Sequence, residues 1–227
     1  MDLFVTCRMA PTIWGAHSEL LSAPRLDDLA CVYSAMEGFL SVSADRDVLF
    51  HCTLDNEEVG SQSKQGAAST FLRDVIDRIC EAYHIGVDAR AALLARSVFV
   101  SADNAHAAHP GYPAANDPVN RPHLNGGVVL KHHAGHKYIT DASSAALFRL
   151  LCAEHGIPMQ EYTNHSDQRG GSTLGNISNT QVSLNGMDIG LAQLAMHSAY
   201  ETMGAGDPAH LTRFAQVFYT APIPEYV

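Results

Sequence analysis

Two adjacent glutamates, Glu57 and Glu58, follow an apolar run at 48–54 and precede Val59-Gly60-Ser61. The run predicts a buried strand that ends just before them. Neighbouring side chains of an extended segment point to opposite sides, so the two acids can face different partners. One of them can bind a metal ion while the other binds a water molecule on that ion. The alternative is a polar loop with two solvated acids.

Other acids and histidines occupy comparable positions along the chain. They are Asp27 and Asp28 at the junction of a loop and a predicted helix, Asp103 and His106 after a predicted strand at 97–101, and His197 after a predicted strand at 182–191. Because functional groups gather at the carboxyl ends of strands in α/β sheets, we expect these side chains to converge. Taken singly, Asp103 is typical of a turn and His197 of a buried histidine. Their combination favours a zinc site, or two sites that share one carboxylate.

Hydrophobic periodicity predicts the elements that position these residues. The expected helices span 26–40, 65–83, 88–95, 141–155 and 208–219, with a short helical segment opening at Gly170-Gly171-Ser172-Thr173. The expected strands span 2–7, 48–54, 97–101, 126–130, 137–140, 158–162 and 182–191, with loops at 11–24 and 102–118. This alternation predicts a three-layer α/β/α sandwich around a mixed, mostly parallel sheet, in a single domain over 1–227.

Composition narrows the possible partners and the compartment. The 227 residues carry 24 acidic and 14 basic side chains, for a net charge of −10. That balance disfavours nucleic acid and anionic membranes as partners. No apolar run approaches the ~20 residues of a membrane span, and the first residues do not resemble a secretory leader. Five widely spaced cysteines predict reduced thiols and a cytoplasmic protein.

Six sequence blocks, in order, extend over nearly the whole chain. They are Ala23-Pro24-Arg25-Leu26-Asp27-Asp28, Asp55-Asn56-Glu57-Glu58-Val59-Gly60-Ser61, 101–110, 124–131, 170–175 and 188–198. Together they resemble the aspartyl aminopeptidase family of dinuclear zinc exopeptidases, and its bacterial members in particular. The resemblance implies a zinc-exopeptidase fold and hydrolysis of the amino-terminal residue of peptides.

The resemblance also implies a role for each matching residue. Asp27 bridges two metal ions, Glu57 is the general base, Glu58 and His197 bind one ion, Asp103 binds the other, and His106 lies beside the substrate. It further implies a cis peptide bond between Asp27 and Asp28. The expected metal is zinc, although a carboxylate-rich site with one histidine also accepts cobalt or manganese.

Three further residues are candidates for substrate binding. Lys131 could pair with an acidic substrate side chain, because an ammonium suits a carboxylate; the alternative is a surface lysine. Gly171 and Ser172 precede the short helical segment and, by the resemblance, contact the substrate backbone. Full-length relatives are expected to be homo-oligomers, whereas the oligomeric state of this chain stays open.

The chain departs from the family pattern at its amino end. In the family, a metal-binding His-x-Asp segment and an inserted β-rich dimerisation domain precede the block at Asp27, whereas here Ala16-His17-Ser18 provides no such segment. We therefore expect a truncated metallopeptidase catalytic domain without its amino-terminal part and without the dimerisation domain. One metal site should be complete (Asp27, Glu58, His197) and the other impaired (Asp27, Asp103). The alternative is a non-catalytic structural or regulatory fragment that retains the fold and at most one well-formed metal site.

Overall fold

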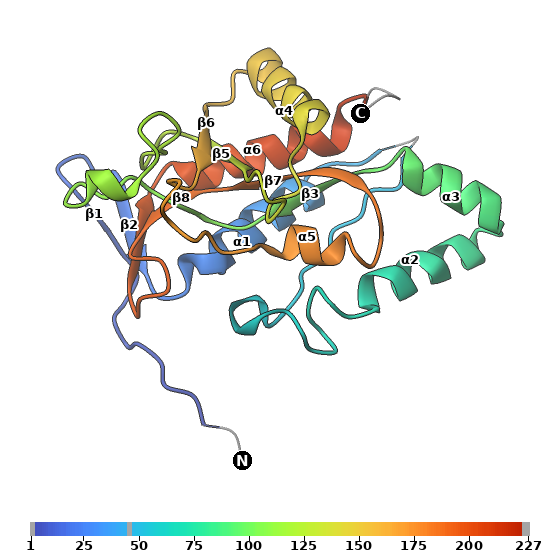
Figure 1. Cartoon of the computed structure of the whole chain (residues 1–227), viewed down its shortest axis with the longest axis horizontal. Helices are drawn as coiled ribbons and strands as arrows, with labels where there is room; N and C mark the ends of the chain where they lie inside the picture. The colour runs from blue at the N-terminus through green and yellow to red at the C-terminus, as the bar shows by residue number, and fades with distance from the viewer. Residues whose placement is uncertain (1–2, 45–46, 224–227) are drawn as a thin grey trace.

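The strands of the protein divide over two mixed sheets. The structure, a computed structural model, describes residues 3–44 and 47–223 (Figure 1). The first sheet has the order β1 (Thr12–Trp14), β2 (Leu20–Ala23), β9 (Glu201–Gly204), β8 (Ala192–Leu194) and β4 (Ala105–His106). The second has the order β3 (Val98–Ala102), β7 (Asn185–Gly190), β5 (Val128–His132) and β6 (Met159–Thr163). Only Leu191 separates β7 from β8, so one stretch of chain passes directly from the second sheet to the first.

Both sheets combine parallel and antiparallel pairs. In the second sheet β3 pairs with β7 and β5 with β6 in parallel, while β5 and β7 are antiparallel. In the first sheet β4 and β8 are parallel, and the other pairs are antiparallel. Parallel strands place the ends of β3 and β4 beside the ends of β7 and β8. This arrangement brings the loop at Asp103 close to the segment that leads to His197.

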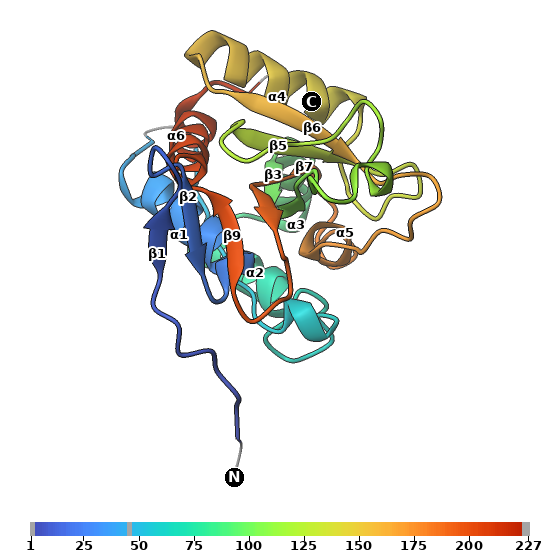
Figure 2. The same cartoon turned by 90° about the vertical axis from the view of Figure 1, so that its left-hand side faces the viewer.

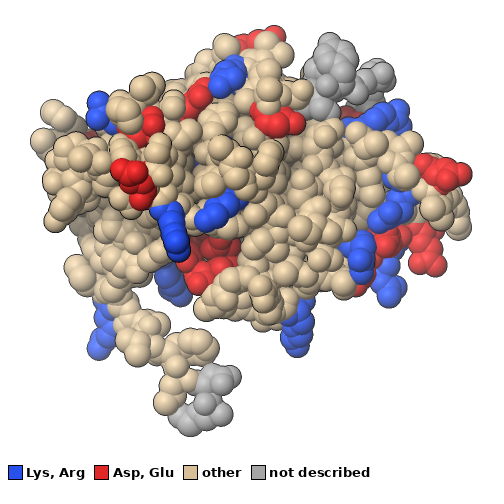
Figure 3. Space-filling model, viewed as in Figure 1, with Lys and Arg blue, Asp and Glu red and all other residues tan. Residues whose placement is uncertain are grey.

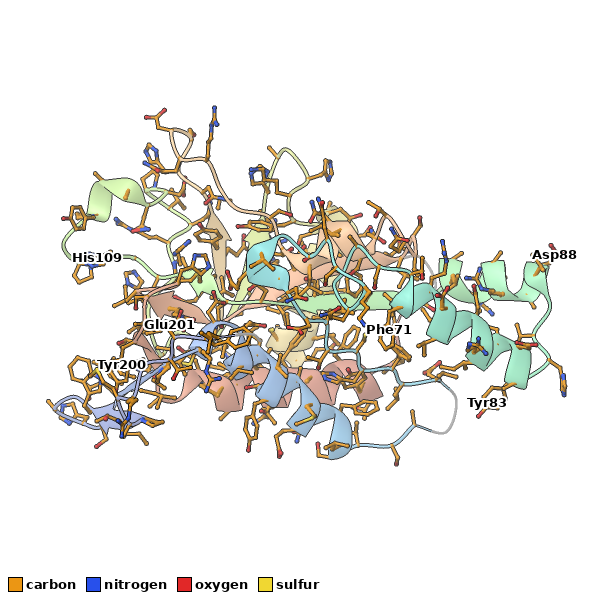
Figure 4. The ribbon with its side chains drawn as sticks, turned by 90° about the horizontal axis from the view of Figure 1, so that it is seen from below. Phe71, Tyr83, Asp88, His109, Tyr200 and Glu201 are labelled. Atoms are coloured by element: carbon orange, nitrogen blue, oxygen red, sulfur yellow. The ribbon has the colours of Figure 1, made fainter. Side chains whose placement is uncertain are left out.

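Helices lie on both sides of the second sheet, as Figures 1 and 2 show. On one side α1 (Leu26–Leu40), α4 (Ala142–His155) and α6 (Asp207–Thr220) pack together, and α5 (Leu174–Ser178) lies on the other. A hairpin of α2 (Phe71–Ala82) and α3 (Val87–Ala95) extends away from the sheets, marked by Phe71, Tyr83 and Asp88 in Figure 4. The predicted α/β sandwich with a mixed sheet is confirmed.

The main hydrophobic core lies between this helical layer and the second sheet. Phe148 of α4 and Phe214 of α6 are almost fully buried, with ring centroids 4.9 Å apart. They pack against Leu130 of β5 and against Met187 and Ile189 of β7. Most side chains of β5 and β7 are buried on both faces of the sheet, including the charged side chains of Lys131 and Asp188.

Several predicted helices begin and end where the sequence indicates. Asp141 accepts a hydrogen bond from the backbone N–H of Ser144 at 2.8 Å and so caps α4 as predicted. Gly156 ends that helix with φ 61°. Helix α2, however, begins at Phe71 rather than near residue 65, because the preceding residues form turns in which the N–H of Ala68 donates to the carbonyl of Ser61.

The strand predicted at 48–54 is wrong. This segment has no paired neighbour in the described part of the chain, and a strand exists only as a member of a ladder. It packs instead beside two helices: His51 stacks on Phe39 of α1, and Tyr219 of α6 donates its hydroxyl to the carbonyl of Phe50. The apolar run therefore reflects partial burial and not strand pairing.

Three other predictions about strands and loops also need correction. Residues 3–7 form no strand, and Leu3, Phe4 and Val5 are exposed; residue 2 of that prediction lies outside the described part. Residues 137–140 form a bend rather than a strand, because the backbone N–H of Ile139 bonds to the Asp188 carboxylate and not to a neighbouring strand. The predicted loop at 11–24 contains β1 and β2, which are too short for a clear periodicity.

No described helix is long and apolar enough to cross a membrane. Acidic and basic side chains are interspersed on the face drawn in Figure 3.

Replacement of Phe214 by alanine tests the core. We expect Phe214→Ala to lower the free energy of unfolding by about 3–5 kcal/mol, because the buried ring leaves a cavity. Urea denaturation of the purified protein measures the change. Phe4→Ala is the matched control, since Phe4 is 87% exposed and its loss should change stability little. Equal effects of the two substitutions would contradict the assigned core.

Candidate metal centre

The side chains of Asp27, Glu58 and His197 form one cluster. The Nε2 atom of His197 lies 3.2 Å from Asp27 Oδ2 and 3.0 Å from Glu58 Oε2. One ligand atom from each residue fits within 4.8 Å of the others. The Asp27 side chain is only 2% exposed, whereas His197 and Glu58 are about half exposed. The cluster therefore has a buried base and an open side.

Unusual backbone conformations present these three residues. Asp27 has non-helical φ/ψ at the start of α1, and the predicted cis bond between Asp27 and Asp28 is confirmed. Glu58 lies in a 3₁₀ turn (Glu57–Val59) that ends at Gly60 with φ 99°, a value that glycine adopts without strain. His197 itself has φ 65° in the loop between β8 and β9. The three ligand candidates thus lie at a helix start, in a 3₁₀ turn and in a loop, where the backbone departs from regular α-helix or strand geometry.

A second cluster contains Asp27, Asp28 and Asp103, again with ligand atoms within 4.8 Å of one another. It shares Asp27 with the first cluster, in agreement with the expected arrangement of two sites around one carboxylate. It includes Asp28, which the sequence analysis did not place among the ligands. Its donors are all carboxylates, whereas the first cluster has an imidazole.

Lys131 is buried beneath this second cluster, so the alternative of a surface lysine is wrong. Its side chain is 2% exposed, and its ammonium lies 2.8 Å from Asp103 Oδ2. It also donates to the backbone carbonyls of Asp103 and Asn104, each at 2.9 Å. Burial opposes a charged ammonium, but Asp103, Tyr138 and Asp188 together outweigh it and raise the pKa of Lys131. Pairing with a substrate side chain would require Lys131 to give up one of these partners.

Crowding of acids raises several pKa values in the centre. Burial, the charge of Asp103 and the contact with Glu58 raise the pKa of Asp27 to about 8. Burial and Asp103 also raise the pKa of Asp28. Glu57 is raised to a pKa of about 7 by burial, followed by the charges of Asp103 and Glu58. A divalent cation in the centre would favour the ionised acids and so oppose these shifts.

Two buried oxygen atoms provide the test of whether a metal ion fits. Asp27 Oδ1 and Asp28 Oδ1 have no hydrogen-bond partner in the described structure. Buried polar atoms are almost always paired, and carboxylate oxygens with no donor are suited to a cation. Two carboxylates and an imidazole form a donor set typical of zinc, while three carboxylates suit harder cations such as magnesium or manganese. The residues therefore fit a metal ion, and the first cluster fits zinc better than the second.

The other candidate residues lie at different distances from this centre. The ring of His106, at the end of β4, is 6.5 Å from the ring of His197, and burial followed by His197 lowers its pKa. Gly171 and Ser172 lie in the loop before α5, which is anchored where the Thr173 hydroxyl donates to Asp188. Among the described residues, no hydrogen bond or ion pair joins Gly171 or Ser172 to Asp27, Glu58 or His197, so their role in substrate binding stays a prediction.

Sequence reasoning missed two polar residues around the centre, Asn104 and Glu201. It expected Asp28 to lie near the other acids but assigned it no ligand role. Buried Asn104 donates to the carbonyl of Leu26 at 2.9 Å and thus supports the residue before Asp27. Buried Glu201 accepts backbone hydrogen bonds from both Asp27 and His197. Neither Asn104 nor Glu201 lies in a spacing that indicates these contacts.

With this geometry in place, the comparisons with known proteins identify the family. Residues 1–219 match the model of the family described as "Aminopeptidase I zinc metalloprotease (M18)", so the chain belongs to this family. A relative from Clostridium novyi (strain NT), "Probable M18 family aminopeptidase 2", is 39% identical over 218 residues, which are 96% of this chain and 50% of the relative.

Solved structures agree with the family assignment. The structure titled "Crystal structure of prApe1" has a TM-score of 0.86 and 29% identity, and the match covers 94% of this chain and 46% of that one. "Structure of S. cerevesiae mApe1 dodecamer" has a TM-score of 0.78 and 28% identity, covering 94% and 49%. The chain thus spans about half the length of the relatives that it matches.

The acid cluster predicts how stability depends on pH. Between the ordinary Asp pKa of 3.8 and the folded value of about 8, folded Asp27 holds a proton that the unfolded chain has released. The free energy of unfolding of metal-free protein should therefore fall as pH rises through this range. Urea denaturation in a chelator at pH 5, 6, 7 and 8 measures the slope.

The control for this prediction is a pair of matched variants. Asp27→Asn should flatten the pH dependence, whereas Asp74→Asn removes an exposed acid on α2 and should leave it unchanged. Stability that rises with pH in the metal-free protein would contradict the crowding of acids around Asp27.

Proposed function

We propose that this chain carries catalytic machinery of a zinc-dependent aminopeptidase. The observation that carries the proposal is the cluster of Asp27, Glu58 and His197, with Glu57 directly beside it in the same 3₁₀ turn. Family membership supports it, because the family is described as a zinc metalloprotease. The Clostridium novyi relative, named a probable aminopeptidase, supports removal of residues from an amino terminus.

Asp27, Glu58 and His197 would hold one zinc ion, and Asp103 would hold a second together with Asp27. Asp28 is an additional oxygen donor for this second position. When bound, zinc supplies a polarised water molecule and polarisation of the substrate carbonyl. Cobalt or manganese could replace zinc, because carboxylate-rich sites accept several divalent ions.

Glu57 would act as the general base. Its raised pKa, about 7, lies near neutral pH, where a base both accepts and returns a proton effectively. It would take a proton from the attacking water and deliver it to the amine that leaves when the peptide C–N bond breaks. His106, close to His197 at the open side of the cluster, would donate a hydrogen bond to the carbonyl oxygen as negative charge develops there.

The proposed substrate is a peptide with a free amino terminus, positioned in part by Gly171 and Ser172. Assembly into a homo-oligomer is part of the proposal, because one similar structure is titled a dodecamer. A cytoplasmic location fits the five cysteines, all free in the structure.

The alternative function is a non-catalytic, metal-binding fragment. The composition of the second cluster favours it, because that cluster contains no histidine among the described residues. A site without an imidazole donor binds zinc less well relative to harder cations. On this alternative the chain binds one zinc ion and hydrolyses nothing.

Substitution of Glu57 separates these two functions. The purified chain, loaded with zinc, should hydrolyse aminoacyl p-nitroanilides, and Glu57→Gln should lower kcat by about 10²–10⁴-fold because the proton acceptor is removed. Zinc content should remain as in the parent protein. A zinc-loaded chain without hydrolysis would favour the non-catalytic alternative, and full activity of Glu57→Gln would contradict the assigned base.

Zinc titration tests whether the two clusters differ in their affinity for zinc. Isothermal titration calorimetry should show one tight zinc ion per chain and a second that binds much more weakly, because only the first cluster has an imidazole. His197→Ala should remove the tight site, whereas His133→Ala, in the exposed turn after β5, should not. Two equally tight sites would contradict this account.

A further inference from the structure

Glu201 occupies the point where the two ligand-bearing loops meet. It begins β9, which lies between β2 and β8 in the first sheet, and it is 2% exposed. The chain leaves β2 and reaches Asp27 after Leu26, and it leaves β8 and reaches His197 after a short turn. Figure 4 labels Glu201 next to Tyr200, at the end of the molecule away from the α2–α3 hairpin. A side chain at this place can contact both loops at once.

Each carboxylate oxygen of Glu201 accepts one backbone hydrogen bond from a ligand candidate. The N–H of Asp27 donates to Oε2 at 2.9 Å, and the N–H of His197 donates to Oε1 at 2.8 Å. Hydrogen bonds to an ionised carboxylate are about twice as strong as neutral ones. Because the carboxylate is rigid and planar, the two bonds fix the backbone of Asp27 relative to that of His197.

The backbone is irregular at both Asp27 and His197, so neither segment is held by regular secondary structure alone. Ala195 and His197 have φ of 56° and 65°, in the left-handed region that is strained for non-glycine residues. Asp27 departs from helical angles inside the first turn of α1. Neither N–H is paired in a strand ladder, so Glu201 supplies an acceptor that the local secondary structure does not.

We propose that Glu201 is a positioning residue, which sets the separation of Asp27 and His197 and thereby the metal affinity of their cluster. The inference rests on the proposed metal-dependent function. Glu201 acts through the backbone of the two residues and not through their side chains. Outer residues that orient metal ligands typically change affinity by about 10–100-fold when they are replaced.

Asp207 provides a matched control. It is fully buried at the start of α6, and its two oxygens accept backbone hydrogen bonds from Asn125 at 2.7 Å and from Gly127 at 3.0 Å. It thus makes the same kind of paired contact as Glu201. Neither of its partners is a ligand candidate, so its loss affects folding without a direct effect on the cluster.

The first experiment measures zinc affinity by calorimetry and stability by urea denaturation in three variants. Glu201→Gln removes the charge and one acceptor, Glu201→Asp keeps the charge but shortens the reach, and Asp207→Asn is the control. Both Glu201 variants should bind the tight zinc ion about 10–100-fold more weakly, while Asp207→Asn loses stability but keeps parent affinity. If Glu201→Asp binds zinc as tightly as the parent protein, the inference is overturned, because only the charge of residue 201 would then affect zinc affinity.

The second experiment is independent of metal and separates this inference from the proposed function. Amide hydrogen exchange in metal-free, folded protein should be about 10-fold or more faster at Asp27, at His197 or at both in Glu201→Gln than in the parent, because the glutamine amide offers one acceptor oxygen to two N–H groups. Unchanged exchange at both amides would overturn the inference. If the parent protein binds no zinc and exchange is still faster in Glu201→Gln than in the parent, the metal site is rejected and the positioning role is retained.

Discussion

The mutual repulsion of buried carboxylates around Asp27 is the interaction on which the site depends. Asp27 belongs to both clusters and lies at their buried base. The described cations in contact with the clusters are Lys131 beneath Asp103 and, when protonated, His197 above Asp27. Burial, followed by the charges of the neighbouring acids, raises the pKa of Asp27 to about 8 and that of Glu57 to about 7 despite these two cations. The folded chain therefore favours an additional cation at this position.

The two sheets explain how residues far apart in sequence reach this point. The pairing of β2, β9 and β8 places the loops at Asp27 and His197 on either side of Glu201. The parallel pairing of β3 with β7 and of β4 with β8 brings Asp103 to the same region. Below it, Lys131 of β5 holds the Asp103 loop from inside the protein. The fold thus fixes the backbone of the site and holds its acidic side chains close to one another.

The sequence predicted those features that depend on local pattern. Amphipathic periodicity predicted α1, α4 and α6 closely, and the cap at Asp141 followed from one residue type. The positions of Asp27 and His197 beside predicted elements made them candidates, the resemblance of whole blocks gave them ligand roles, and the structure brings them together. The strand at 48–54 was wrong because strand formation needs a neighbour that no local pattern reveals. Burial of Lys131 and the contacts of Glu201 were missed for the same reason, since both depend on pairs distant in sequence.

The central claim is that one zinc ion binds through Asp27, Glu58 and His197. X-ray absorption at the zinc edge, on protein loaded with one equivalent, tests it most directly because it reports the atoms bound to the metal. The account predicts oxygen and nitrogen ligands with a single imidazole, whose signal disappears in His197→Ala. A shell with sulfur, or with two or more imidazoles that persist in that variant, would place the ion elsewhere and contradict the account.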